Sequence, residues 1–205
     1  MYLIRKRSQM FLDIFPSKVT ILDDYWTQVV GSRYAQAVQK KELQTFQCPD
    51  ELMQYCQGER PIRGTSWMDV EMLLIPLNIT NTHWVAMVID IPSWYIYLLD
   101  SDLMANASEK MKTIVEPFVH LVPMILKKSG IFSHPLKVRE YVPFQYLRLS
   151  DGVPRQVTSG ECGVFTYKFL EMYMMRCKLT QFSDDHCYSV RKCLASEIFA
   201  CDMDP

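Results

Sequence analysis

Residues 83–101 read HWVAMVIDIPSWYIYLLDS, and the architecture of the chain follows from this stretch. Two apolar runs, His83–Ile89 and Trp94–Leu99, flank a short segment of turn residues, which is typical of a β-hairpin. A third apolar run, Met72–Leu77, precedes them, so three strands in a meander are predicted. Both faces of the second and third strands are apolar, so we expect helices to cover the sheet on both sides.

Helical patterns surround these strands. Apolar residues from Tyr25 to Val38 recur every three or four positions behind Asp23 and Asp24, acids that favour a helix N-terminus. Pro76 is expected at a strand end or an edge. Four further elements are predicted: a helix to about Lys128 that Pro117 and Pro123 bend or break, a strand near 138–146, a helix after Cys162 and a last helix from Ser183. The prediction is an α+β fold in which one domain spans residues 1–205.

The composition excludes several classes of protein. With 22 Lys and Arg against 23 Asp and Glu, the net charge of -1 creates no field that would concentrate nucleic acid. No apolar run reaches the roughly 18 residues of a membrane span. The start, Met1–Arg7, reverses the order of a secretory signal, and seven cysteines without a C-x-x-C pair argue against a disulfide framework. We therefore expect an intracellular protein, nuclear or cytoplasmic, with neither nucleic acid nor membrane as its partner.

His83 and Asp100 are the first candidate pair. If the hairpin turns at Ile91–Pro92 or over the four residues Asp90–Ser93, opposed residue numbers sum to 183. His83 then faces Asp100, with Cβ atoms about 5 Å apart, and the carboxylate could orient the imidazole. A turn with an odd number of residues would separate them onto opposite faces. The alternative is that both are ordinary residues of a turn-rich sheet.

Cys162 is the second candidate. The run 156–165, QVTSGECGVF, passes from a polar loop into helical spacing, so the thiol is expected at a helix N-terminus. There the helix dipole and unpaired N–H groups favour a thiolate and could bind an oxyanion. Gln156 could add a side-chain amide to the same anion, and Gly163 would let a substrate backbone approach. The alternative is a buried thiol that packs as a small apolar group.

These segments occur in a characteristic order: His83-Trp84, then Leu99-Asp100-Ser101, then Gln156 six residues before Cys162-Gly163. From about Trp67 to Met175 this order resembles the ubiquitin-like protease family, the SUMO-protease-type cysteine peptidases. The resemblance implies a papain-like architecture, with a central mixed sheet flanked by helices and the nucleophile at a helix N-terminus. The implied roles are Cys162 as nucleophile, His83 as general base, Asp100 as its orienting acid, Gln156 as oxyanion donor and Trp84 as a wall of the channel for a Gly-Gly tail.

The resemblance also implies a function. This function is cleavage after the C-terminal diglycine of a ubiquitin-like modifier, with SUMO as the first candidate. The implied partners are the modifier and its conjugates, and no cofactor is implied. The alternatives are a catalytically impaired relic that binds modifiers and, third, an acyltransferase. The C-terminal His186, Cys187, Cys193 and Cys201 fit no zinc pattern, so no metal is predicted.

Two departures from the family pattern stand out. Glu161 replaces the Asp that usually precedes the nucleophile. Met1–Arg7 reads like the middle of the family's first substrate-binding helix, so the catalytic domain is expected to lack its first N-terminal segment. The nearest likeness is to the plant, transposon-associated branch.

Overall fold

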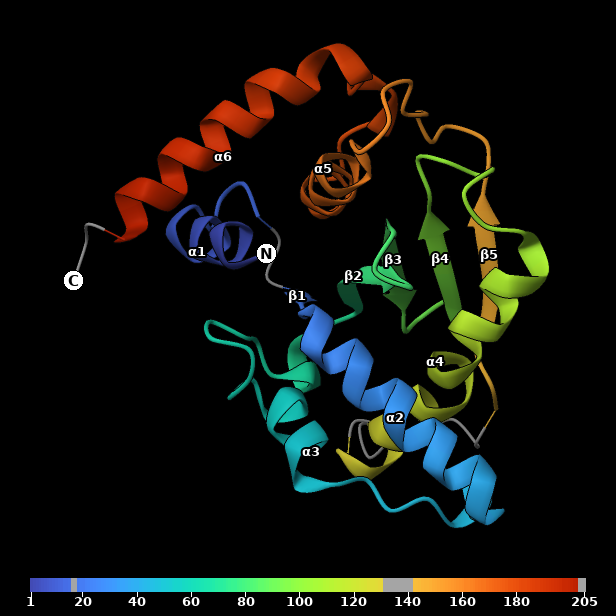
Figure 1. The fold of residues 1–205 in the computed structure, drawn as a ribbon. Helices are drawn as coiled ribbons and strands as arrows, with labels where there is room; N and C mark the ends of the chain where they lie inside the picture. The colour runs from blue at the N-terminus through green and yellow to red at the C-terminus, as the bar shows by residue number, and fades with distance from the viewer. Residues whose placement is uncertain (16–17, 131–141, 203–205) are drawn as a thin grey trace.

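A five-stranded sheet lies between two layers of helices in the computed structural model, which describes residues 1–15, 18–130 and 142–202 (Figure 1). Strands β2, β3 and β4 form the predicted antiparallel meander, while β1 pairs with β2 and β5 pairs with β4 in parallel. The sheet is therefore mixed. In spatial order its strands are β1 Val19–Ile21, β2 Met72–Ile79, β3 His83–Asp90, β4 Tyr95–Leu99 and β5 Gln145–Leu149.

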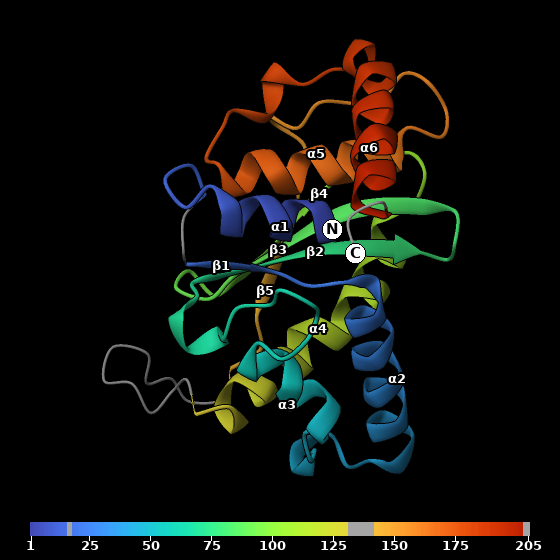
Figure 2. The same ribbon diagram turned by 90° about the vertical axis from the view of Figure 1, so that its left-hand side faces the viewer.

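Helices cover both faces of the sheet, as predicted (Figure 2). One layer holds α1 Tyr2–Met10, α5 Cys162–Met174 and α6 Cys187–Asp202, and the other holds α2 Asp24–Lys40, α3 Asp50–Gln57 and α4 Ser108–Lys128. In the described ranges the short 3-10 helices are η1 Leu43–Thr45, η2 Trp67–Asp69, η4 Leu179–Gln181 and η5 Asp184–His186. Among the described helices, none is long and apolar enough to cross a bilayer.

Strand β3 serves both helical layers because its side chains alternate. Val85 and Met87 pack in the core that contains α2 and α4, whereas Ala86 and Val88 pack in the core that contains α5. The same alternation assigns His83 to the α4 side of the sheet and Trp84 to the α5 side. Neighbouring residues of one strand thus project into different layers.

The predicted helices form, with two differences. Helix α2 begins as predicted, since the Asp23 side chain accepts a hydrogen bond from the Trp26 amide at 3.0 Å. Helix α4 continues through Pro117 and Pro123, so of the two predicted outcomes, a bend or a break, the break is wrong. Eight of its residues are buried, and at roughly 1.5–3 kcal/mol for each large apolar side chain this burial outweighs about 3 kcal/mol per proline.

The last helix starts slightly later than predicted. Ser183 caps η5 through reciprocal hydrogen bonds with His186, and α6 begins at Cys187.

The fifth strand and Pro76 also refine the predictions. The strand predicted near 138–146 falls partly on residues 131–141, outside the described residues, and the described strand is β5 Gln145–Leu149. Pro76 lies inside β2 opposite Ala86, so a strand end is wrong. However, β1 pairs with β2 only as far as Leu74. In the described part of the chain, the stretch of β2 at Pro76 is therefore an edge on the β1 side. Proline, which has no backbone N–H, is tolerated there because no neighbouring strand requires that donor.

Candidate active site

His83 and Asp100 meet, although not by the predicted register. Opposed residue numbers in β3 and β4 sum to 185 rather than 183, because the turn extends to Trp94, which has a positive φ of 64°. The prediction that His83 lies directly opposite Asp100 is therefore wrong, because the strand register is shifted by two residues. The parity is unchanged, so both side chains stay on one face and meet diagonally, with 2.7 Å between His83 Nε2 and Asp100 Oδ1.

The Asp100 carboxylate is fully buried and held on both oxygens. Oδ1 also accepts the Asp102 amide at 2.9 Å, and Oδ2 accepts Arg148 Nε at 3.0 Å together with its Nη2. Burial raises the pKa of Asp100, but the hydrogen bonds from His83, the Asp102 amide and Arg148 outweigh it and lower the pKa below its usual value. Within the neutral imidazole, a carboxylate acceptor at Nε2 selects the tautomer that carries its proton on Nε2. Nδ1 is then the nitrogen that can accept a proton.

Arg148 and Arg155 belong to this site, and the sequence reasoning missed both. Arg148 also donates to the carbonyls of Asn106, at 2.8 Å, and Leu103, at 3.3 Å. Arg155 donates to the Asp100 carbonyl and to that of Ser150. The available signal in the sequence was the charged residue Arg148 within a short apolar strand. It points to a buried acid only once β5 is known to lie beside β4.

Cys162 is the first residue of α5, as predicted, and its side chain is buried. Intrahelical bonding starts at Val164 and Phe165, whose amides donate to the Glu161 carbonyl at 2.9 and 3.0 Å. The Cys162 and Gly163 amides precede that first bonded turn, where a helix offers its N–H groups to an anion. Within the part of the chain that the structure describes, no hydrogen bond joins the Cys162 thiol to the His83 ring.

Gln156 is held beside the acid. Its amide donates to the Ser101 carbonyl at 3.0 Å, and its side-chain Oε1 accepts the Ser101 hydroxyl at 3.0 Å. Because Oε1 is the accepting end, Nε2 is the end that can donate to another group. Ser101 therefore links Gln156 to the segment that carries Asp100.

Trp84 and Cys162 line one cavity of about 710 Å³. Gly163 lies close to the indole, since a Cβ built on it would come within 3.8 Å of Trp84 Cδ1. Leu194 and Ile198 of α6 line the same cavity. The space beside the thiol is thus formed by β3, α5 and α6.

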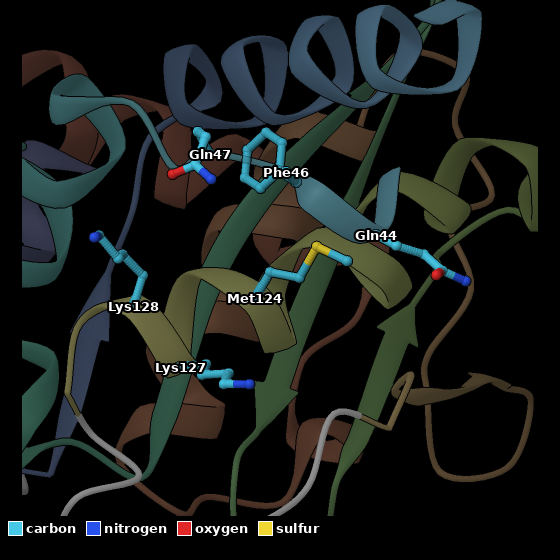
Figure 3. Close-up of a pocket in the computed structure, with 6 residues that line it drawn as sticks. All are labelled: Gln44, Phe46, Gln47, Met124, Lys127 and Lys128. Atoms are coloured by element: carbon cyan, nitrogen blue, oxygen red, sulfur yellow. The ribbon is translucent and has the colours of Figure 1, made fainter. Parts of the chain in front are cut away.

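Another cavity, of about 680 Å³, lies in the opposite helical layer (Figure 3). It is lined by Gln44, Phe46 and Gln47 near η1 and by Met124, Lys127 and Lys128 at the end of α4. None of these lining residues offers a thiol or an imidazole. Of these two cavities, the one beside Cys162 is the one whose lining includes a thiol.

His186 and Cys187 take part in the local packing at the start of α6. The His186 ring accepts the Ser183 amide at 3.1 Å, and the Cys187 thiol is buried. Across the described ranges, no group of three or more His, Cys, Asp or Glu side chains could hold a metal ion.

Known proteins give an independent comparison. A family model described as Ulp1 protease family, C-terminal catalytic domain, matches residues 1–203. The solved C-terminal Ulp1 protease domain in complex with Smt3, the yeast ortholog of SUMO, is similar with a TM-score of 0.57 and 14% identity, over 92% of this chain and 71% of that chain. The catalytic domain of the Chaetomium thermophilum Ulp1-like SUMO protease is similar with a TM-score of 0.55 and 16% identity, over 92% and 64%. No curated protein matches the sequence.

Proposed function

The chain belongs to the Ulp1 protease family, and from this premise we propose that it cleaves after the C-terminal diglycine of a ubiquitin-like modifier, SUMO being the first candidate. It is a Ulp1-family cysteine protease domain with a Ulp1-like fold, as the resemblance predicted. The observation that best supports the proposed chemistry is the 2.7 Å contact between His83 Nε2 and Asp100 Oδ1. The assignment to a plant, transposon-associated branch stays a prediction.

In the proposed reaction, Cys162 is the nucleophile and His83 is the base. His83 Nε2–H donates its hydrogen bond to the Asp100 carboxylate. His83 Nδ1 is therefore the nitrogen that takes the proton from the thiol. The thiolate attacks the glycine carbonyl, and the imidazolium then protonates the leaving amine as the thioester forms. His83 next removes a proton from water, which attacks the thioester carbonyl. The bond to Cys162 Sγ then breaks, the modifier leaves with a free carboxylate, and the imidazolium returns its proton to the thiolate.

Gln156 and the Cys162 amide are the proposed oxyanion donors. The Ser101 hydroxyl occupies Gln156 Oε1 and so favours presentation of Nε2 as a donor. The Cys162 amide lies at the start of α5, where the helix dipole also favours negative charge. Preorganised donors of this kind cost little reorganisation when the oxyanion forms.

Substrate selection is assigned to the cavity beside Cys162. Trp84 and the helix that begins at Cys162 line it, and a diglycine tail has no Cβ atoms to collide with such walls. Selection then works by exclusion of bulkier tails. The proposed partners are the free modifier and its conjugates.

The proposed location is the nucleus or cytoplasm. The six described cysteines, among them Cys162 and Cys187, are free thiols, which suits a reducing compartment. Fluorescence imaging of the tagged chain tests this location.

A modifier carrying a C-terminal electrophile tests the proposed reaction. We expect SUMO with a C-terminal vinyl sulfone to add to the protein, with a mass shift on the peptide that contains Cys162. Cys162→Ser abolishes the adduct, whereas Cys193→Ser, at an exposed cysteine of α6, leaves it unchanged. Failure of every modifier tested to form an adduct would reject the proposal.

The second candidate function is modifier binding without catalysis. It is favoured by one observation, since among the described residues no hydrogen bond joins Cys162 to His83. Binding of SUMO at micromolar concentration without any adduct would support this function over the peptidase.

A further inference from the structure

The loop that enters α5 is largely exposed, and it connects Gln156 to Cys162. It begins at Gln156 and ends at Glu161. Val157, near its start, is 87% exposed. Exposed loops with few apolar contacts are mobile unless other groups hold them. Two side chains of the C-terminal segment hold this one.

Asp184, the first residue of η5, holds the start of the loop. Its Oδ1 accepts the amides of Val157 at 2.9 Å and Thr158 at 3.1 Å, and its Oδ2 accepts the Thr158 hydroxyl at 2.6 Å. The Thr158 hydroxyl and the Val157 amide lower the pKa of Asp184 below its usual value. The carboxylate therefore fixes two successive peptide units directly after Gln156.

Arg191 of α6 holds the end of the loop. Its Nε donates to both Glu161 oxygens, at 3.0 and 3.3 Å, and its Nη2 donates to the Gly160 carbonyl at 3.0 Å. The Glu161 side chain is only 16% exposed and immediately precedes Cys162. Figure 1 shows the start of α6 close to the loop that enters α5.

We propose that Asp184 and Arg191 are positioning residues, which act through the 156–161 loop to align the oxyanion donor Gln156 and the nucleophile Cys162. This inference rests on the proposed function. The Asp184 carboxylate binds the start of the loop and the Arg191 guanidinium binds its end. The C-terminal segment therefore sets the separation between Gln156 and the Cys162 sulfur. Misplacement of a reacting group by about 1 Å can cost on the order of 100-fold in rate.

Asp184→Ala gives the sharpest test. With SUMO carrying a C-terminal aminomethylcoumarin, we expect kcat to fall about 10- to 100-fold while KM changes less than about twofold. Alkylation of Cys162 by iodoacetamide, followed by mass spectrometry, stays within about twofold of wild type because this reaction needs no oxyanion donor. Asp184→Asn restores most of kcat, since its Oδ1 still accepts both amides. Asp185→Ala, at the exposed neighbouring acid, behaves as wild type.

Arg191 gives a smaller, parallel effect because its side chain is half exposed. We expect Arg191→Ala to lower kcat about 3- to 10-fold and Arg191→Lys to recover part of it. Lys192→Ala, at the adjacent exposed cation, is the matched control and leaves kcat unchanged.

Two outcomes overturn the inference. One is an Asp184→Ala enzyme whose kcat stays within twofold of wild type. The other is a loss of kcat matched by an equal loss of Cys162 alkylation or of helical circular dichroism, which indicates general damage rather than alignment.

A wild-type protein that turns over no modifier rejects the proposed function instead. Amide hydrogen exchange at Val157 and Thr158 then decides the inference separately. Protection in wild type that disappears in Asp184→Ala supports the role of Asp184, and equal exchange in both proteins rejects it.

Discussion

The acid side and the thiol side of the candidate site are stabilised in different ways. Asp100 is fully buried at the end of a central strand, where His83, Arg148 and a backbone amide surround its carboxylate. The loop before Cys162 is exposed, and side chains from the C-terminal segment hold it. The acid side therefore takes its geometry from the sheet, whereas surface hydrogen bonds hold the loop before the thiol. Substitutions on the two sides should differ in their effects on rate and on stability.

Asp100→Asn should have the largest effect. An amide at this position cannot hold the Nε2 proton in the same way and favours the wrong imidazole tautomer, so we expect kcat to fall about 10⁴-fold. Asp102→Asn is the matched control, because its side-chain oxygen can still accept the Met104 and Ala105 amides. Steady-state hydrolysis of the coumarin substrate measures both variants. A loss below tenfold in Asp100→Asn would remove the orienting role of this acid.

Gln156→Ala tests the thiol side. Loss of one oxyanion donor is expected to lower kcat about 100- to 1000-fold, while alkylation of Cys162 continues at nearly the wild-type rate. Gln145→Ala, at an exposed position of β5, is the control. Retention of full kcat by Gln156→Ala would show that this side chain does not bind the oxyanion.

Arg148→Met tests the claim that the acid side depends on the folded sheet. Removal of one partner leaves a buried carboxylate without its guanidinium, at a cost of about 3–5 kcal/mol in the free energy of unfolding. Urea denaturation followed by circular dichroism measures the loss. Arg176→Met, at an exposed arginine after α5, should change the midpoint little. A midpoint for Arg148→Met equal to that of wild type would contradict the proposed dependence.

Acid titration should give the smallest effect. Because the pKa of Asp100 is lower in the folded protein, its contribution to stability is present above the ordinary pKa of 3.8. That contribution disappears as the pH falls from there through the lowered pKa of the folded state. Each unit of difference between the two values is worth about 1.4 kcal/mol. Urea midpoints measured from pH 5 to pH 2 should therefore fall less steeply in Asp100→Asn than in wild type.

The acid side was partly predictable from the sequence because β-strand parity survives an error in the turn. The predicted turn ended at Pro92 or at Ser93, whereas Trp94 adopts a left-handed conformation and shifts the register by two residues. A shift of two keeps His83 and Asp100 on one face. A shift of one would have separated them.

Other features depend on tertiary neighbours and carry no local signal. Arg148 reaches Asp100 only because β5 lies parallel to β4, a pairing between segments about fifty residues apart. Asp184 contacts the loop from η5 and Arg191 contacts it from α6, and the sequence could place this C-terminal segment only approximately. Local rules also misjudged α4, where burial outweighs the two prolines. Cys162 was predictable as a helix start because the change from polar loop to apolar helix lies in the sequence itself.

The alternation along β3 has a practical consequence for engineering. His83 and Trp84 are consecutive, yet one side chain meets the acid and the other lines the cavity under α5. If the proposed function holds, proton transfer by His83 and tail recognition by Trp84 should be separable by changes one position apart. Libraries confined to position 84 and the cavity-facing side of α6 should redirect preference among tails while leaving the reaction chemistry intact.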